Sequence, residues 1–165
     1  MMPLILTTPL RVLVIGAGRA GLIKVRSALR YQQDITVIST DFSAEIQAEA
    51  CHQIPADFYE MTADDMSGWD LIYLAIPWPQ CLDKQAFISS WADELKARKK
   101  LLCISCRPTL GNVVNPCSRR VGDHTLTLSG ADMRPKNTKG LTEQLAQHFA
   151  LMLKDKVINE KIATL

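Results

Sequence analysis

Residues 11–39, RVLVIGAGRAGLIKVRSALRYQQDITVIS, decide the fold of this chain. They begin with the apolar run 11–16, which is typical of a central parallel strand covered on both faces. From Gly18 to Arg30 apolar residues recur at helical spacing, and 35–39 is a second apolar strand. A strand, a tight turn, a helix and a further strand predict a βαβ unit with a right-handed crossover.

Strands and helices continue to alternate up to Pro108. The patterns predict a helix over 43–52, a short strand over 56–60, a strand over 71–76, a helix from Pro79 to Arg98, and a strand over 101–105. Together these elements predict an α/β fold with a Rossmann-like, doubly wound parallel sheet.

Beyond Pro108 the pattern changes to two strands, 112–120 and 124–129, around a turn at Gly122-Asp123, and then a helix over 138–154. This part is too small to form a core in isolation, so we expect it to pack on a partner chain. The sequence therefore predicts a dinucleotide-binding Rossmann domain over 1–107, and a dimerisation hairpin with a short helical region over 108–165. We expect a homodimer.

Composition excludes several classes of protein. The chain has 165 residues, and its 19 Lys+Arg against 17 Asp+Glu leave a net charge of +2. That charge is too small for binding nucleic acid mainly through phosphate neutralisation. The apolar opening segment is interrupted by Thr7 to Arg11 before it reaches transmembrane length, so we expect no membrane partner. Five scattered cysteines favour a reducing cytoplasm over a disulfide framework.

The sequence Gly16-Ala17-Gly18-Arg19-Ala20-Gly21 is a complete G-x-G-x-x-G motif, placed between an apolar strand and a helix. In this context Gly16 permits the tight turn, Gly18 lets the backbone approach a diphosphate, and Gly21 allows close packing of helix on strand. The helix start adds free N–H groups and a positive dipole end. We therefore expect all six residues to contact a dinucleotide, although a glycine turn without a ligand is the alternative.

The second strand ends with Ser39-Thr40-Asp41. In dinucleotide folds an acidic residue at this point usually binds the ribose hydroxyls. Asp41 is thus a candidate NAD contact, whereas Ser39 and Thr40 would not exclude the 2′-phosphate of NADP. We expect NAD as the cofactor.

Two segments of the chain match one family. Residues 3–29, PLILTTPLRVLVIGAGRAGLIKVRSAL, resemble the start of the amino-terminal module of siroheme synthase, the precorrin-2 dehydrogenase/sirohydrochlorin ferrochelatase family. Lys24 and Arg26 match the Lys-x-Arg pair of its first helix. The similarity continues over 108–116, PTLGNVVNP, then Gly122, and then 125–129, TLTLS.

This resemblance implies NAD-dependent oxidation of precorrin-2 to sirohydrochlorin, and in some members iron insertion to give sirohaem. A tetrapyrrole with carboxylate arms suits charge-assisted hydrogen bonds. The basic residues in the half that would line such a site are Arg107, Arg119, Arg120, Arg134, Lys136 and Lys139. The candidate substrate contacts are Arg107, Asn112, Arg120 and Ser129, although ordinary solvated surface is the alternative for any one of them.

The catalytic position departs from the family pattern. Members generally carry an aspartate just before the proline, as a general base, whereas this chain reads Ser105-Cys106-Arg107-Pro108. A thiol is a poor substitute for a carboxylate unless basic neighbours lower its pKa. The run 129–135, SGADMRP, also differs from the family's Ser-Thr-Gly-Gly segment. Cys106 and Asp123 are the candidate catalytic residues.

Cys103 and Cys106 form a C-x-x-C pair without the further ligands that a zinc site needs, so we expect no metal site. Buried strand cysteines are the favoured interpretation. Three hypotheses remain: a precorrin-2 dehydrogenase, a protein of the same fold that binds nucleotide or tetrapyrrole without turnover, and an unrelated small oxidoreductase or nucleotide sensor.

Overall fold

The computed structural model describes residues 5–131 and 135–163, with side chains over 5–131 and 137–154. Its contacts divide the chain into two compact units, Met2–Val114 and Asn115–Leu165. The division thus falls after Val114, whereas the sequence placed it after Arg107.

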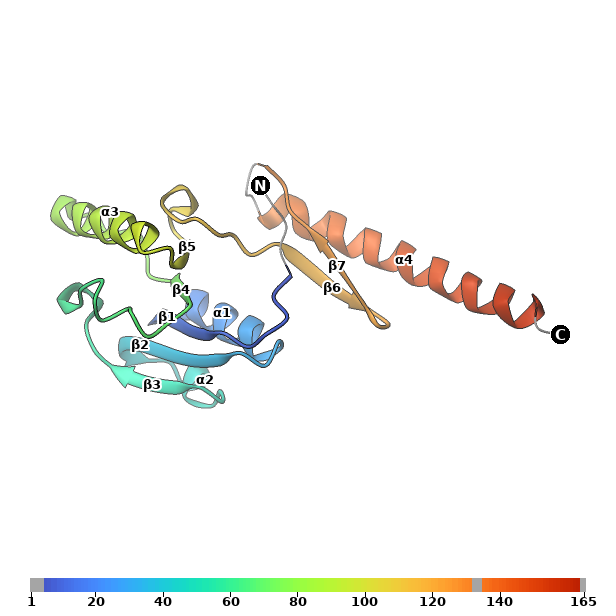
Figure 1. Cartoon of the computed structure of the whole chain (residues 1–165), viewed down its shortest axis with the longest axis horizontal. Coiled ribbons are helices and arrows are strands. Elements are labelled where there is room, and N and C mark those ends of the chain that lie inside the picture. The colour runs from blue at the N-terminus through green and yellow to red at the C-terminus, as the bar shows by residue number, and fades with distance from the viewer. Residues whose placement is uncertain (1–4, 132–134, 164–165) are drawn as a thin grey trace. The chain divides into compact units, whose positions relative to one another are not determined.

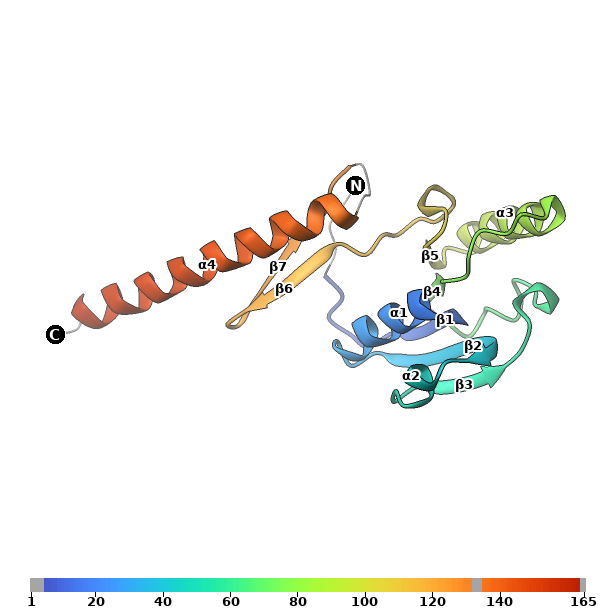
Figure 2. The same cartoon turned by 180° about the vertical axis from the view of Figure 1, so that it is seen from behind.

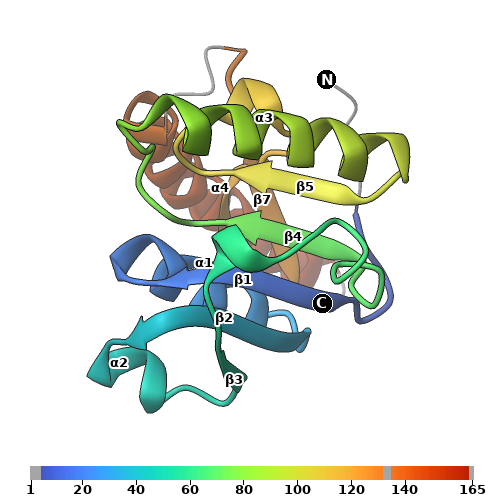
Figure 3. The ribbon, with the colours of Figure 1, turned by 90° about the vertical axis from the view of Figure 1, so that its left-hand side faces the viewer.

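The first unit is built on a five-stranded sheet in the order β3-β2-β1-β4-β5 (Figures 1 and 3). The strands are β1 (Arg11–Ala17), β2 (Asp34–Phe42), β3 (His52–Pro55), β4 (Leu71–Leu74) and β5 (Leu101–Ile104). All four pairings are parallel. The order reverses at β1, because the chain builds outward to β3 and then returns to add β4 on the other side. The predicted doubly wound parallel sheet is therefore confirmed.

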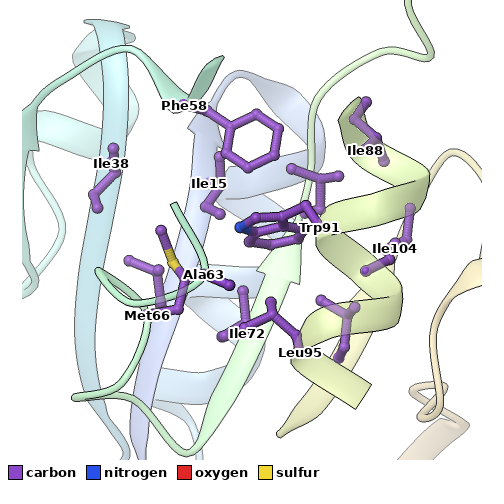
Figure 4. Packing of buried hydrophobic residues seen from close by; sticks show 14 residues of the cluster. Ile15, Ile38, Phe58, Ala63, Met66, Ile72, Ile88, Trp91, Leu95 and Ile104 are labelled. Atoms are coloured by element: carbon purple, nitrogen blue, oxygen red, sulfur yellow. The ribbon is translucent and has the colours of Figure 1, made fainter. Parts of the chain in front are cut away.

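One face of the sheet is covered by helix α3 (Leu82–Ala97). Figure 4 shows Trp91, Ile88 and Leu95 of this helix packed against Ile15, Ile72 and neighbouring strand residues. Phe58 closes the cluster and contacts Trp91 edge to face, with 4.9 Å between ring centroids. Alternate residues of each strand point to this face, as the period of two requires.

The opposite face is covered by helix α1 (Arg19–Leu29) and the short helix α2 (Ala44–Gln47). Val25, Ala28 and Ile46 from these helices pack on Val14 and Val37 of the central strands. Because both faces are buried, the central strands have continuous apolar sequences.

The region between β2 and β4 differs from the prediction. The predicted strand over 56–60 is wrong: β3 is His52–Pro55, and residues Phe58–Glu60 form the 3₁₀ turn η1. An edge strand with mostly exposed residues shows no apolar pattern, whereas Phe58 is apolar because it packs from the turn into the core. The predicted helix over 43–52 is also too long, since α2 ends at Gln47.

Helix α3 begins later than predicted, at Leu82 after Cys81, and not at Pro79. Pro77 and Pro79 disfavour helical backbone in the residues that precede them. The Gln85 side chain then donates a hydrogen bond to the Pro79 carbonyl at 2.9 Å. Residues 77–80 are consequently a loop at the carboxyl end of β4.

The second unit consists of the hairpin β6 (Cys117–Val121) and β7 (His124–Leu128), with helix α4 (Pro135–Ala163) (Figure 2). The predicted turn at Gly122 is confirmed, and its φ of 59° is one that glycine tolerates. Helix α4 packs on both strands, and Thr138, Thr142 and Ala146 are buried at four-residue spacing along it. The helix is longer than the predicted span of 138–154.

Candidate functional site

The glycine turn after β1 has three distinct steric environments. Gly16 has a φ of 102°, and a Cβ there would lie 3.0 Å from the Ala75 carbonyl oxygen. A Cβ on Gly21 would lie 1.9 Å from the Gly16 carbonyl oxygen, so α1 packs directly on the turn. A Cβ on Gly18 would meet no atom within 4 Å. The fold itself thus needs glycine at 16 and 21, whereas glycine at 18 leaves open space above the turn.

The start of α1 presents free backbone donors above this turn. Gly18 is the N-cap residue, and the first helical hydrogen bond that the structure records there runs from Leu22 N to Gly18 O at 2.9 Å. The N–H groups of Arg19, Ala20 and Gly21 precede that bond. Among the described residues no acidic side chain lies in the first turn. Such a helix start favours an anion, because the unpaired N–H groups and the helix dipole point toward it.

A pocket of about 210 Å³ lies next to the turn, at the carboxyl ends of the central strands. Its lining residues are Ile15, Gly16, Ile38, Ser39, Thr40, Ala56, Asp57, Phe58, Tyr59, Ile76 and Pro77. Ligands of doubly wound sheets bind at this edge, where the strand order reverses. The volume is below the roughly 300–1,000 Å³ of pockets for drug-sized ligands, so it suits one half of a dinucleotide.

The end of β2 contributes Ser39 and Thr40 to this pocket, while Asp41 is exposed and is not among the lining residues. The register of β2 with β1 shifts after Ile38, so residues 39–41 lie in an irregular part of this strand pairing. The acidic lining residue is Asp57 instead, from the loop after β3. Sequence reasoning missed Asp57 because it placed a strand over 56–60.

The loops after β4 and β5 carry the second part of the site. Cys106 is half-buried and packs against the core, and burial raises the pKa of its thiol, with a smaller lowering from hydrogen bonds and the nearby Arg107. The Arg107 guanidinium lies over the Trp78 ring, 4.7 Å from its centroid. The thiol therefore stays protonated at neutral pH, and its basic neighbour does not reverse this.

Tyr59 connects the pocket with these loops. Burial raises the pKa of its phenol, and the charge of Asp57 adds to the increase. Lys84 of α3 lies over the Tyr59 ring, 4.2 Å from the centroid. Sequence reasoning missed Tyr59, Lys84 and Trp78, since no motif or spacing marks them.

The two cysteines of the C-x-x-C pair lie on opposite sides of the sheet. Cys103 is buried in the core beneath α1, and Lys24 Nζ is 3.8 Å from its Sγ. Cys106 packs in the core beneath α3. In the described part of the chain, no three His, Cys, Asp or Glu side chains gather as metal ligands.

The side chain of Asn112 forms hydrogen bonds to the backbone at the edge of the sheet. Its Oδ1 accepts a hydrogen bond from Leu102 N, and its Nδ2 donates to Lys100 O, both at 2.7 Å. Its backbone N–H also donates to Leu102 O at 2.9 Å. These contacts give the Asn112 amide a structural role at β5, and the predicted substrate contact is not supported by any of them.

The remaining predicted residues belong to the second unit. Asp123 is exposed in the β6–β7 turn, Arg120 is exposed with Nε donating to Gly122 O at 3.3 Å, and Ser129 is exposed after β7. Arg119 forms an ion pair with Glu143 at 2.6 Å. Arg134 and the side chain of Lys136 lie outside the described residues.

A model of a protein family described as "Putative NAD(P)-binding" matches residues 5–117 of this chain. The chain belongs to this family. The matched span of the NAD(P)-binding family includes the glycine turn, the pocket and the sheet. It also indicates a nicotinamide dinucleotide as the cofactor, without a choice between NAD and NADP.

One solved structure shares the fold of this NAD(P)-binding chain, and a second aligns over part of the chain. SirC, a precorrin-2 dehydrogenase, aligns with a TM-score of 0.70 at 20% identity, over 93% of this chain and 76% of that one. A structure titled "a putative NADH-flavin reductase", from Streptococcus pneumoniae, aligns with a TM-score of 0.45 at 22% identity, over 58% of this chain and 46% of that one. The curated proteins contain no match. None of the helices, over the residues described, is both long and apolar enough to span a lipid bilayer.

Proposed function

We propose that this chain is an NAD-dependent precorrin-2 dehydrogenase of siroheme biosynthesis. The observation that carries the proposal is the glycine turn. Only glycine fits at positions 16 and 21, whereas glycine at 18 leaves open space next to the N–H groups at the start of α1. The match to the NAD(P)-binding family supports the cofactor. The resemblance over 3–29 and 108–129 and the fold shared with SirC support the substrate.

The residues around the turn fit a dinucleotide. The N–H groups of Arg19, Ala20 and Gly21 would hold the diphosphate, and the pocket between β2 and β4 would hold one nucleoside. When bound, the nicotinamide ring supplies a hydride acceptor. Oxidation of precorrin-2 to sirohydrochlorin releases one hydride and one proton, so the chain must also provide a group or a path for the proton.

Cys106 occupies the position of the base in this proposal, and Arg107 faces the substrate carboxylates from its place on Trp78. The catalytic role of Asp123 and the substrate contacts of Arg120 and Ser129, which all belong to the second unit, remain predictions. Because the thiol of Cys106 is held protonated, proton removal should be slow at neutral pH. The same observation favours a second candidate function, a dinucleotide- or tetrapyrrole-binding protein with little turnover. Iron insertion would be a further activity of the same site.

We also propose a homodimer formed through the second unit, and a cytoplasmic location in keeping with the scattered cysteines of the sequence. On α4, Leu141, Leu145 and Met152 are each about half exposed within one chain. Such a stripe of apolar side chains marks an interaction surface. An isologous interface between two copies would cover it.

The decisive experiment measures binding and turnover separately on the full chain. Calorimetric titration with NAD tests the turn, and the visible absorbance of sirohydrochlorin after addition of precorrin-2 and NAD tests the reaction. Turnover supports the dehydrogenase, and NAD binding without turnover selects the binding protein. If neither NAD nor NADP binds, the dehydrogenase is wrong, and the second candidate function then requires that the chain binds a tetrapyrrole.

A further inference from the structure

The pocket beside the glycine turn contains one carboxylate in largely apolar surroundings. Ile38, Ala56, Phe58 and Ile76 supply much of the lining, and Asp57 is half-buried among them. A carboxylate in such a place is expected to have a partner, since desolvation without a hydrogen bond is costly. The identity of that partner follows from how Asp57 is held and from where its loop lies.

Asp57 is fixed by its neighbours in the chain. Its Oδ1 accepts a hydrogen bond from Tyr59 N at 2.9 Å, and the preceding Ala56 N–H donates to Ser39 O at 3.2 Å, which ties the loop to β2. Phe58 anchors the loop in the core, with its ring against Phe87 and Trp91. An ionised carboxylate offers about four acceptor positions. Within the described residues Tyr59 N–H is the donor recorded for it, so acceptor capacity remains for a ligand.

The strand order then places the parts of a dinucleotide along the sheet edge. The diphosphate belongs at the turn after β1, and the ribose at the end of the neighbouring strand β2, where Ser39 and Thr40 line the pocket. The next strand outward is β3, and Asp57 follows it. The part of the ligand that reaches β3 is therefore the base, and the apolar lining residues suit a flat ring.

We propose that Asp57 recognises the base of the bound dinucleotide by accepting a hydrogen bond from the 6-amino group of a purine. An ionised carboxylate only accepts hydrogen bonds, so it favours a 6-amino purine and repels a 6-oxo purine, whose oxygen is also an acceptor. This inference rests on the proposed dinucleotide binding and adds a specificity-determining residue to it.

The test compares NAD with nicotinamide hypoxanthine dinucleotide, which carries an oxygen in place of the 6-amino group. We expect the full chain to bind NAD about 10- to 100-fold more tightly, the range for a hydrogen bond to a charged group. In Asp57→Asn the side-chain oxygen can still accept from Tyr59 N, which leaves the NH₂ group as the group available to a ligand. Since that group donates, the preference should disappear or reverse.

Three further variants make the result specific. Asp57→Ser keeps a side chain that can cap the turn and should abolish the preference without reversing it. Asp83→Asn removes an exposed carboxylate in the first turn of α3 and should keep it. Asp41→Asn, at the end of β2, should keep the preference for the base, whatever its effect on the affinity for both dinucleotides. Thermal unfolding confirms that each variant is folded.

Each outcome decides between the two proposals. If NAD binds but Asp57→Asn and Asp57→Ser keep the wild-type preference for the base, this inference is overturned and the dinucleotide site stands. A change confined to the ratio of NAD to NADP affinity would assign Asp57 to the ribose and also overturn it. If no dinucleotide binds the unaltered chain, the proposed function fails, and the inference fails with it.

Discussion

Gly18 and Gly68 form a matched pair, because a Cβ at either position would meet no protein atom within 4 Å. Gly18 has a φ of −85°, which alanine adopts without strain. Gly18→Ala and Gly68→Ala should therefore both unfold at temperatures near that of the unaltered chain. Only Gly18→Ala should weaken NAD binding, by about tenfold, since its methyl group occupies the space above the turn. Equal NAD affinity for both variants, measured by calorimetry, would contradict this assignment.

The raised pKa of the Cys106 thiol predicts that turnover depends on pH. Its thiolate is the basic form, and because burial raises the thiol pKa, turnover should increase as the pH rises above the ordinary thiol range of about 8.5. A carboxylate ionises near 4, so Cys106→Asp should be active at pH 7 and nearly independent of pH there. The gain at pH 7 should be roughly thirtyfold or more, the ratio of ionised fractions.

The control for this pH profile is Cys106→Ser, which removes the base and should lose the alkaline increase. The measurement is the initial rate of sirohydrochlorin formation between pH 6 and 10, at the pH values where each variant remains folded. An alkaline increase in Cys106→Ser would assign the ionisation to another group.

The side chain of Asn112 holds the outer edge of β5 through two hydrogen bonds. Asn112→Ala leaves the N–H of Leu102, a fully buried residue, without its side-chain acceptor. The free energy of unfolding should fall by about 1–3 kcal/mol, measured by urea denaturation. Asn112→Asp keeps an acceptor for Leu102 N but faces Lys100 O without a donor, so we expect it to lose stability as well. Little change in both variants would show that water replaces these bonds.

In the sheet of the first unit, the sequence predicted the strands whose residues are buried and failed at the exposed edge strand. Strands β1, β2, β4 and β5 are buried and apolar, so their patterns identified them. Strand β3 is a mostly exposed edge strand. Its sequence has no apolar pattern from which its pairing with β2 could be predicted. The error moved Asp57 from a loop into a strand and hid it from the candidate site. The glycine turn was predicted because its requirements are local, whereas the cation–π pair of Arg107 and Trp78 joins loops separated by a whole helix.

The proposed homodimer depends on the exposed apolar side chains of α4. Leu141 and Leu145 are 55% and 46% exposed within one chain, so Leu141→Glu and Leu145→Glu should cost little in the fold of that chain. In the double variant the molar mass from light scattering should fall to that of a monomer, 18.4 kDa. Ala146→Glu is the contrasting variant. Ala146 is buried, so placing a charged side chain there should unfold the second unit. A dimer that survives the double variant would place the interface elsewhere.

The backbone of residues 111–113, which lies alongside β5, determines where a shortened form of this protein can end. Leu102 O accepts hydrogen bonds from the N–H groups of Asn112 and Val113. This short segment therefore covers part of the edge strand β5, whose backbone groups there would otherwise be unpaired. Unsealed strand margins invite cross-chain pairing and fibril growth. A shortened protein ending at Arg107 would expose this edge of β5, whereas one ending at Val114 would keep the segment that pairs with it. We therefore expect residues 108–114, which include the 3₁₀ turn η2 (Pro108–Leu110), to separate a fragment that resists edge-to-edge aggregation from one that self-associates.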